Sequence, residues 1–210
     1  MIKPKGILFD LDGVILDTEG IYTRFWDEVE RHYPTGIPDF SSVIKGSNLH
    51  EILFDHYPDA PTRDAVTAML VDFQRNMRYE YFSGVPEFIC QIEALGIPAC
   101  IVTSSDNDKM DAVYRQHPDF RSHFNAIVTG EMVSKAKPDP ECFRLGAEKI
   151  GVDVKDCWIF EDSIKGLKAA RSAGGVVIGV PTTNPLEVVE QLADVVIDGF
   201  EELQLKDLIK

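Results

Sequence analysis

Two aspartates, Asp10 and Asp12, follow directly after a short apolar run, and Gly13 comes next. If the run is a β-strand, both carboxylates point to the same side, because side-chain direction alternates along a strand. Gly13 allows a sharp turn where a bulkier residue would be strained. Two carboxylates this close repel each other unless a cation lies between them or one holds a proton. The segment indicates a metal site, an acid/base pair or both, with an ordinary turn as the alternative.

The same DxDG pattern occurs in calcium-binding loops, but the spacing argues against such a loop here. If Asp10 is position 1, Val14 stands at position 5, where an oxygen ligand is needed. Ile21 then stands at position 12, where the loop requires a bidentate glutamate. A turn or a catalytic site therefore remains.

Further polar clusters follow other apolar runs along the chain. They are Thr103, Ser104 and Ser105 after CIV, Lys137 in KAKPDP after NAIVT, and Glu161 with Asp162 after CWIF. Each cluster alone is as readily a helix cap or a solvated strand end. In parallel sheets, however, ligands gather at the carboxyl ends of the strands. The coincidence of several clusters on one sheet edge favours a catalytic or binding site.

The elements that must position these residues are predicted from alternating β-rich and helical runs. From Gly96 onward, strands are expected over 98–103, 125–129, 157–162, 176–180 and 194–198, with helices over 106–117, 140–150, 164–175 and 185–193. This alternation predicts a parallel sheet wrapped by helices. The strand runs are apolar throughout, as expected for strands covered on both faces.

Residues 18–83 lack strand signals and read as helices over 19–33, 49–57 and 62–82, separated by proline and glycine. We expect an all-helical insertion after the first strand, with its own small core. The predicted core positions are Phe25, Trp26, Val29, Ile52, Leu53, Met69, Leu70 and Phe73.

Composition narrows the class of protein. A chain of 210 residues with 44% hydrophobic residues can bury a full core. Its net charge of −14 argues against nucleic acid or an anionic membrane as a partner. The apolar start is too short for a signal peptide and no run has transmembrane length, so we expect a cytoplasmic location. Four buried thiols are expected at Cys90, Cys100, Cys142 and Cys157.

The four motifs FDLDGVILDTE, IVTSS, KAKPDP and FEDS, in this order, resemble those of the haloacid dehalogenase superfamily, in the branch with a helical cap. The resemblance covers essentially the whole chain. It implies an α/β fold with a Rossmann-like parallel sheet core, helices on both faces and an inserted all-helical cap. Residues 1–17 and 84–210 would form the core, and residues 18–83 the cap. The β-phosphoglucomutase-like sugar-phosphate mutases of this branch resemble the chain closely, and its sugar-phosphate phosphatases resemble it too.

The resemblance also implies roles for the motif residues. Asp10 would be the nucleophile that forms an aspartyl-phosphate, and Asp12 the general acid and base. Thr103, Ser104 and Lys137 would bind the phosphate, with Lys135 as a rival lysine. Asp10, Asp12 through its carbonyl, Glu161 and Asp162 would hold Mg²⁺, which prefers oxygen ligands.

The cap would close over the site and select the substrate. Its candidate contacts are Glu19, Tyr22, Lys45, Ser47, Asn48, His50, Arg75, Asn76 and Arg78. Mutases of this branch carry an arginine after the IKG loop to grip a second phosphate, where this chain has Leu49. Leucine cannot replace a bidentate guanidinium contact.

The expected function is therefore a magnesium-dependent phosphatase acting on a small phosphorylated metabolite, such as a sugar phosphate, as a monomer or small homo-oligomer. The alternatives are a mutase of the β-phosphoglucomutase type and a non-catalytic sensor of a phosphorylated metabolite. A pure sensor has no need of both Asp10 and Asp12.

Overall fold

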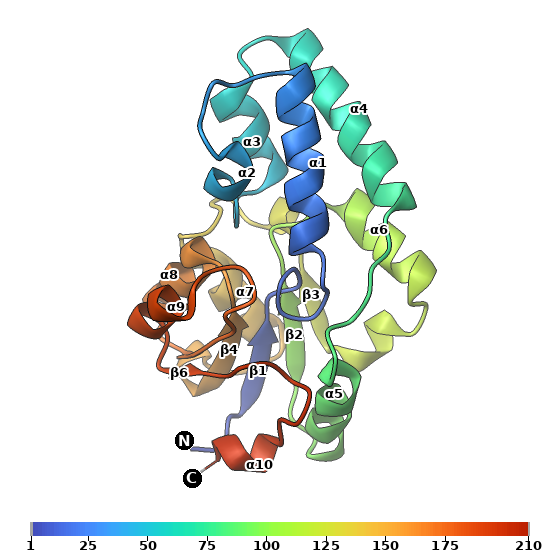
Figure 1. Ribbon diagram of the computed structural model, residues 1–210. Helices are drawn as coiled ribbons and strands as arrows, with labels where there is room; N and C mark the ends of the chain where they lie inside the picture. Colours follow the sequence, from blue (N-terminus) through green and yellow to red (C-terminus); the bar gives the residue numbers. More distant parts are fainter. Residues whose placement is uncertain (1, 210) are drawn as a thin grey trace.

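The computed structural model describes residues 2–209, and over this range six strands form one parallel sheet in the order β3-β2-β1-β4-β5-β6 (Figure 1). The strands are β1 (Gly6–Phe9), β2 (Ala99–Val102), β3 (Ala126–Val128), β4 (Cys157–Glu161), β5 (Val176–Gly179) and β6 (Val195–Val196). Chain order reverses beside β1, which pairs with β2 on one side and β4 on the other. Ligands bind at such switch points in open α/β sheets. The predicted parallel sheet is confirmed.

Helices cover both faces of the sheet. They are α5 (Val85–Ala94), α6 (Asn107–Gln116) and α10 (Leu205–Leu208) on one face, and α7 (Glu141–Lys149), α8 (Ile164–Ala173) and α9 (Leu186–Leu192) on the other. Short 3₁₀ turns lie at Phe120–His123, Gly130–Met132 and Val154–Asp156. Each face of the sheet has its own layer of buried side chains, because successive side chains of β1 point to opposite faces. Phe9 packs into the first layer, under α5, α6 and α10, and Leu8 packs into the second layer, under α7, α8 and α9.

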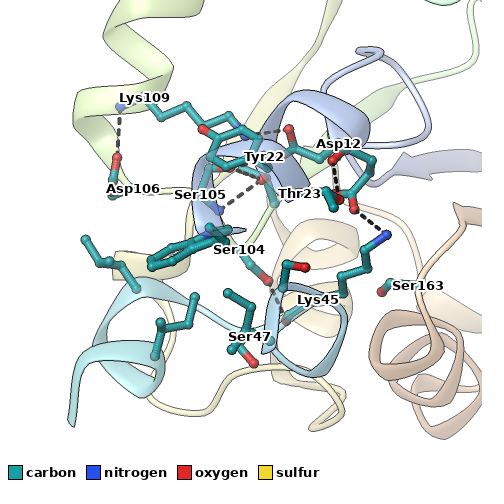
Figure 2. A pocket seen from close by; sticks show the side chains of 18 of the residues that line it. Asp12, Tyr22, Thr23, Lys45, Ser47, Ser104, Ser105, Asp106, Lys109 and Ser163 are labelled. Atoms are coloured by element: carbon teal, nitrogen blue, oxygen red, sulfur yellow. Dashed lines mark hydrogen bonds and ion pairs between the residues drawn. The ribbon is translucent and has the colours of Figure 1, made fainter. Parts of the chain in front are cut away.

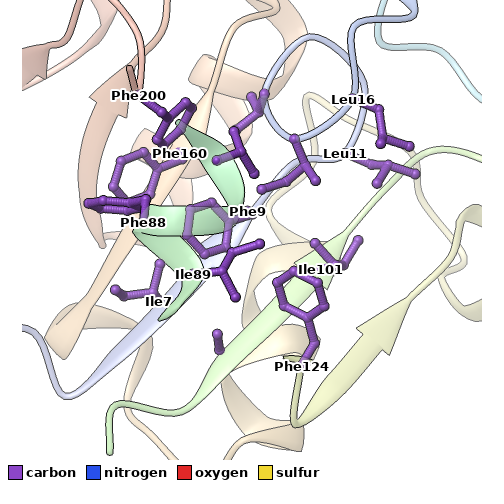
Figure 3. Packing of buried hydrophobic residues seen from close by; sticks show 14 of the residues in the cluster. Ile7, Phe9, Leu11, Leu16, Phe88, Ile89, Ile101, Phe124, Phe160 and Phe200 are labelled. Atoms are coloured by element: carbon purple, nitrogen blue, oxygen red, sulfur yellow. The ribbon is translucent and has the colours of Figure 1, made fainter. Parts of the chain in front are cut away.

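The first layer is rich in aromatic rings (Figure 3). The rings of Phe9 and Phe160 stack with their centroids 4.8 Å apart, and Phe88 from α5 meets Phe160 edge-on at 5.6 Å. These rings lie below the carboxyl ends of β1 and β4 and fix the position of the loops that follow. The segment that contains Asp10 and Asp12 thus follows directly after a close-packed, buried layer of side chains.

The insertion is helical, as predicted, and lies above the carboxyl edge of the sheet (Figure 1). It consists of α1 (Glu19–His32), α2 (Phe40–Val43), α3 (Leu49–His56) and α4 (Ala60–Asn76). Its buried residues form a separate core that includes Trp26, Val29, Val66 and Leu70. The cap therefore has its own hydrophobic stabilisation.

The helix predicted over 62–82 is too long, since α4 ends at Asn76. Residues 77–82 instead return to the core beside the outgoing connection. The amide of Asp17 donates to the carbonyl of Glu80 at 2.9 Å, and the amide of Phe82 donates to that of Ile15 at 3.1 Å. Backbone pairing between the two connections replaces the last helical turns. The exact domain boundaries stay a prediction.

The sequence reading assigned no element to residues 84–95, where the structure has α5. Burial of Cys90 was also predicted wrongly. Phe88, Ile89 and Ile92 of α5 face the sheet, which leaves Cys90 on the exposed side. The other three thiols are buried, as expected. Within residues 2–209, no helix is long and apolar enough to cross a membrane.

Candidate functional site

The loops at the carboxyl ends of β1, β2 and β4 meet in a cavity between the sheet and the cap (Figure 2). Its core side is lined by Asp10, Asp12, Thr103, Ser104, Ser105, Asp106, Lys109, Asp162 and Ser163. Lys137 and Glu161 lie behind Asp10, both almost fully buried. The structure thus brings together all the core residues that the sequence singled out.

Lys137 links the two acidic motifs. Its Nζ donates to Asp10 Oδ1 at 2.8 Å and to Glu161 Oε1 at 2.6 Å. Burial alone would lower the pKa of Lys137, but the two carboxylates outweigh it and raise that pKa. The rival Lys135 lies on the surface, 3.6 Å from Asp139. Lys137 is therefore the lysine that can neutralise charge at Asp10.

Glu161 holds the loop after β4 in place. Its Oε2 accepts the backbone N–H groups of Asp162 and Ser163, both at 2.7 Å. Gly166 on α8 makes room for this carboxylate, because a Cβ at that position would lie 1.6 Å from Glu161 Oε1. Both oxygens of Glu161 are engaged, one with Lys137 and the other with the loop.

The carboxylate of Asp162 could bind a cation. Both its side-chain oxygens are buried, and neither has a hydrogen-bond partner among the residues that the structure describes. One oxygen each from Asp10, Glu161 and Asp162 lie within 4.8 Å of one another. Gly13 permits this approach, because its φ is +77° and a Cβ there would lie 2.1 Å from Asp162 Oδ2.

The electrostatics of these carboxylates also fit a cation. Burial, followed by the charges of neighbouring carboxylates, raises the pKa of Asp162 well above its usual value. Burial likewise raises the pKa of Asp10 to about 7, although Lys137 opposes the shift. A divalent cation among these oxygens would restore the ionised forms. The residues present therefore fit Mg²⁺, a hard ion that takes oxygen ligands.

The carboxylate of Asp12 lies against α6. Its carboxylate accepts from Lys109 Nζ and from the hydroxyl of Thr18, and Oδ2 accepts from Ser105 Oγ at 3.0 Å. Burial would raise the pKa of Asp12, but Lys109 and these hydroxyls outweigh it and lower that pKa. The hydroxyl of Thr103 donates a hydrogen bond to Ser105 Oγ at 2.9 Å.

Sequence reasoning missed Lys109. Its side chain is 4% exposed, and its Nζ also lies 4.4 Å from the ring centroid of Tyr22 on the cap. The sequence did contain a signal, because Lys109 falls in the first turn of the helix predicted over 106–117. The N-terminus of a helix carries partial positive charge, so a lysine there is unfavourable unless an acidic partner lies close by.

The cap residues divide into two groups. Glu19, Tyr22, Lys45 and Ser47 line the cavity, and Lys45 Nζ lies 3.4 Å from Glu19 Oε2. Asn48, His50 and Arg75 do not. Asn48 caps α3 by accepting the amide of Glu51 at 2.8 Å, His50 stacks on Phe54, and Arg75 is exposed. Asn76 and Arg78 are exposed as well. The spacing alone did not reveal that Arg75 and Asn76 lie on the exposed side of α4 and that Arg78 lies beyond its end.

Two contacts close the cap loop onto the core. Ser104 Oγ donates to the carbonyl of Gly46 at 3.2 Å, and Lys165 Nζ contacts Ser47 Oγ. Leu49 follows this loop as the first residue of α3, and it lines the cavity. These contacts hold the cap loop against the core.

Comparisons with known proteins agree with this geometry. Residues 4–174 match the family model of haloacid dehalogenase-like hydrolases. A "Probable pseudouridine-5'-phosphatase" of Drosophila melanogaster is 31% identical over 216 residues, which is 91% of each chain. A β-phosphoglucomutase of Bacillus subtilis is 26% identical over 94% of each chain.

Among solved structures, CbbY from Rhodobacter sphaeroides in complex with phosphate superposes with a TM-score of 0.76. It is 26% identical, and the match covers 97% of this chain and 96% of that one. Fold, motif geometry and sequence similarity agree, and the chain belongs to the haloacid dehalogenase-like hydrolases.

Proposed function

We propose that this protein is a magnesium-dependent phosphatase that hydrolyses a small phosphorylated metabolite, in particular a sugar phosphate, through an aspartyl-phosphate on Asp10. The observation that carries the proposal is the position of Asp10. It lies between Lys137, at 2.8 Å, and the carboxylate of Asp162, which has no hydrogen-bond partner among the described residues. Similarity to phosphatases of the family supports the same activity.

In the first step, a carboxylate oxygen of Asp10 attacks the phosphorus of the substrate. The bond between phosphorus and the ester oxygen breaks, and the leaving oxygen takes a proton from Asp12. Lys137 offsets the negative charge of Asp10 and the phosphoryl group. Thr103, Ser104 and the N–H groups of Leu11 and Ser104 bind the phosphoryl oxygens.

In the second step, water attacks the phosphorus of the aspartyl-phosphate while Asp12 takes a proton from it. The bond between phosphorus and Asp10 breaks, and free phosphate leaves. Asp12 is ready for this role, because Lys109 holds it as a carboxylate. Its protonation for the first step requires the Lys109 contact to loosen.

Asp10, Asp162 and the backbone carbonyl of Asp12 would hold Mg²⁺, and Glu161, which also holds the loop after β4, would complete the site directly or through water. When bound, the ion supplies positive charge that reduces repulsion between Asp10 and the phosphate and stabilises charge on the transferred oxygens.

The mutase is the second candidate, since a β-phosphoglucomutase is among the relatives. A mutase must hold a second phosphate at the cap, and the residue there is Leu49. An aliphatic side chain offers no charge to that group. The phosphatase needs one phosphate site, which the core residues supply. A sensor without turnover would not need the paired positions of Asp10 and Asp12.

One reaction separates these candidates. The protein is supplied with β-glucose 1-phosphate, Mg²⁺ and a trace of the bisphosphate primer, and free phosphate and glucose 6-phosphate are quantified together. We expect phosphate to predominate where this ester is accepted. Predominant glucose 6-phosphate would overturn the phosphatase in favour of the mutase. If neither forms, p-nitrophenyl phosphate and other monoesters are tested, and a protein that hydrolyses none of them fails the proposal.

A further inference from the structure

The cap contributes a mostly uncharged surface to the cavity, and its charged members Glu19 and Lys45 are paired with each other. Its uncharged residues include Trp26 of α1, Ile44 just after α2, Leu49 and Ile52 of α3, and Leu70 and Gln74 of α4. The cavity itself measures about 120 Å³. Because cap residues line it together with the core residues that would bind the phosphate, the organic group of the substrate would lie against the cap.

The lysines that line the cavity already have acidic partners. Lys45 lies 3.4 Å from Glu19, and Lys109 is paired with Asp12. In the part of the chain that the structure describes, no arginine lines the cavity. A second phosphate or a carboxylate against the cap would therefore be desolvated without a counter-charge of its own. An amine would find the nearest cap carboxylate, Glu19, engaged with Lys45.

Gln74 is a polar residue of the cap whose side chain has an unused hydrogen-bond acceptor. The residue lies on α4, is 4% exposed and lines the cavity. Its Nε2 is 3.4 Å from the hydroxyl of Tyr22, whereas its Oε1 is buried and has no hydrogen-bond partner among residues 2–209. A buried amide oxygen without a partner is unfavourable, and a donor on a bound molecule would relieve it.

We infer that the substrate is a monophosphate ester whose organic group is uncharged and donates a hydrogen bond to Gln74 Oε1. This inference rests on the proposed phosphatase and adds the class of organic group to it. The apolar residues of the cap would contact the carbon skeleton, and Gln74 would select for a hydroxyl or N–H on that skeleton.

Matched pairs of substrates test the charge. Values of kcat/KM are compared for sorbitol 6-phosphate and 6-phosphogluconate, for uridine and orotidine 5'-monophosphates, and for glucose 6-phosphate and glucosamine 6-phosphate. We expect the uncharged member to be preferred in each pair that is hydrolysed, by about 10-fold or more. Equal rates, or a preference for the carboxylated or aminated member, would overturn the inference.

Hydrolysis of p-nitrophenyl phosphate tests the phosphatase separately, because its nitro group cannot donate a hydrogen bond. If it is hydrolysed while none of the uncharged esters is, the phosphatase stands and the inference fails. If no ester is hydrolysed, the proposed function itself fails.

A variant of Gln74 tests the hydrogen bond. We expect Gln74→Leu to lower kcat/KM for the best uncharged ester, relative to p-nitrophenyl phosphate, by about 10-fold, the usual effect of losing one hydrogen bond at a buried site. A purely structural role would lower both values together and leave their ratio constant, which would contradict the inference. Asn76→Leu, at an exposed amide of the same helix, is the matched control and should keep the wild-type ratio.

Discussion

The buried pair of Lys109 and Asp12 allows a quantitative test of how this site is held together. Their side chains are 4% and 17% exposed, so the charges are largely shielded from water. Lys109→Met keeps most of the volume of the side chain but leaves the Asp12 carboxylate without its counter-ion. Removing one member of a buried pair costs about 3–5 kcal/mol of unfolding free energy.

The lower end of this range is expected, because Asp12 keeps hydrogen bonds from Thr18 and from Ser105. A loss of about 3 kcal/mol corresponds to a fall in melting temperature of roughly 6–12 °C for a chain of this size. Thermal unfolding followed by circular dichroism at pH 7, in the absence of Mg²⁺, measures it. Lys168→Met, at an exposed position of α8, is the control and should change the free energy by less than about 0.5 kcal/mol.

A double-mutant cycle with Asp12→Asn isolates the interaction itself. Once Asp12 is neutral, Lys109→Met no longer leaves an unpaired carboxylate, so the two substitutions together should destabilise less than the sum of their separate effects. A melting temperature of Lys109→Met within about 2 °C of wild type, or strictly additive effects, would refute the reasoning.

Further predictions concern the metal, the loop after β4, the cap and the surface. Removal of Mg²⁺ by a chelator should abolish phosphate release, and added Mg²⁺ should restore it; activity that persists after dialysis against the chelator would contradict the metal site. Gly166→Ala should displace Glu161, because its Cβ would lie 1.6 Å from Oε1, and lower kcat by about 100-fold with the far-UV spectrum preserved. Leu49→Arg should raise the yield of glucose 6-phosphate relative to free phosphate from β-glucose 1-phosphate, measured in one reaction. The hydrogen bond that His123 donates to Glu93 raises the pKa of His123, so the stabilising contribution of this contact is complete below the unfolded pKa of about 6.5 and is lost as pH rises through the folded value. The difference in unfolding free energy between wild type and His123→Gln should therefore be larger at about pH 5.5 than at about pH 8.5.

The core of the site could be predicted because parallel strands place their carboxyl ends together. Asp10, Thr103 and Asp162 follow three neighbouring strands, so their position after apolar runs was enough to predict one cavity. Lys137 comes from a longer loop, and its selection over Lys135 rested on the family motif. The structure has Lys137 buried against Asp10 and Lys135 at the surface.

The cap side could be predicted only in part. Helical segments and their apolar cores follow from periodicity, but the face that a cap helix turns toward the sheet depends on the two connections at residues 15–17 and 80–82. Arg75 and Gln74 are adjacent in sequence, yet Arg75 is exposed and Gln74 lines the cavity. Lys109 was missed for a similar reason, since its partner Asp12 is 97 residues away in the chain. The cytoplasmic location and the oligomeric state stay predictions.

The central claim is that Asp10 carries the phosphoryl group during turnover. The most direct measurement mixes the protein with Mg²⁺ and an excess of a hydrolysed ester, stops the reaction with acid during turnover, and locates any added phosphoryl group by peptide mass spectrometry. The account predicts a phosphoryl group on the peptide that contains Asp10, released by hydroxylamine and missing in Asp10→Asn, which should be folded but inactive. Phosphate release at the wild-type rate by Asp10→Asn, or a phosphoryl group on another residue, would contradict it.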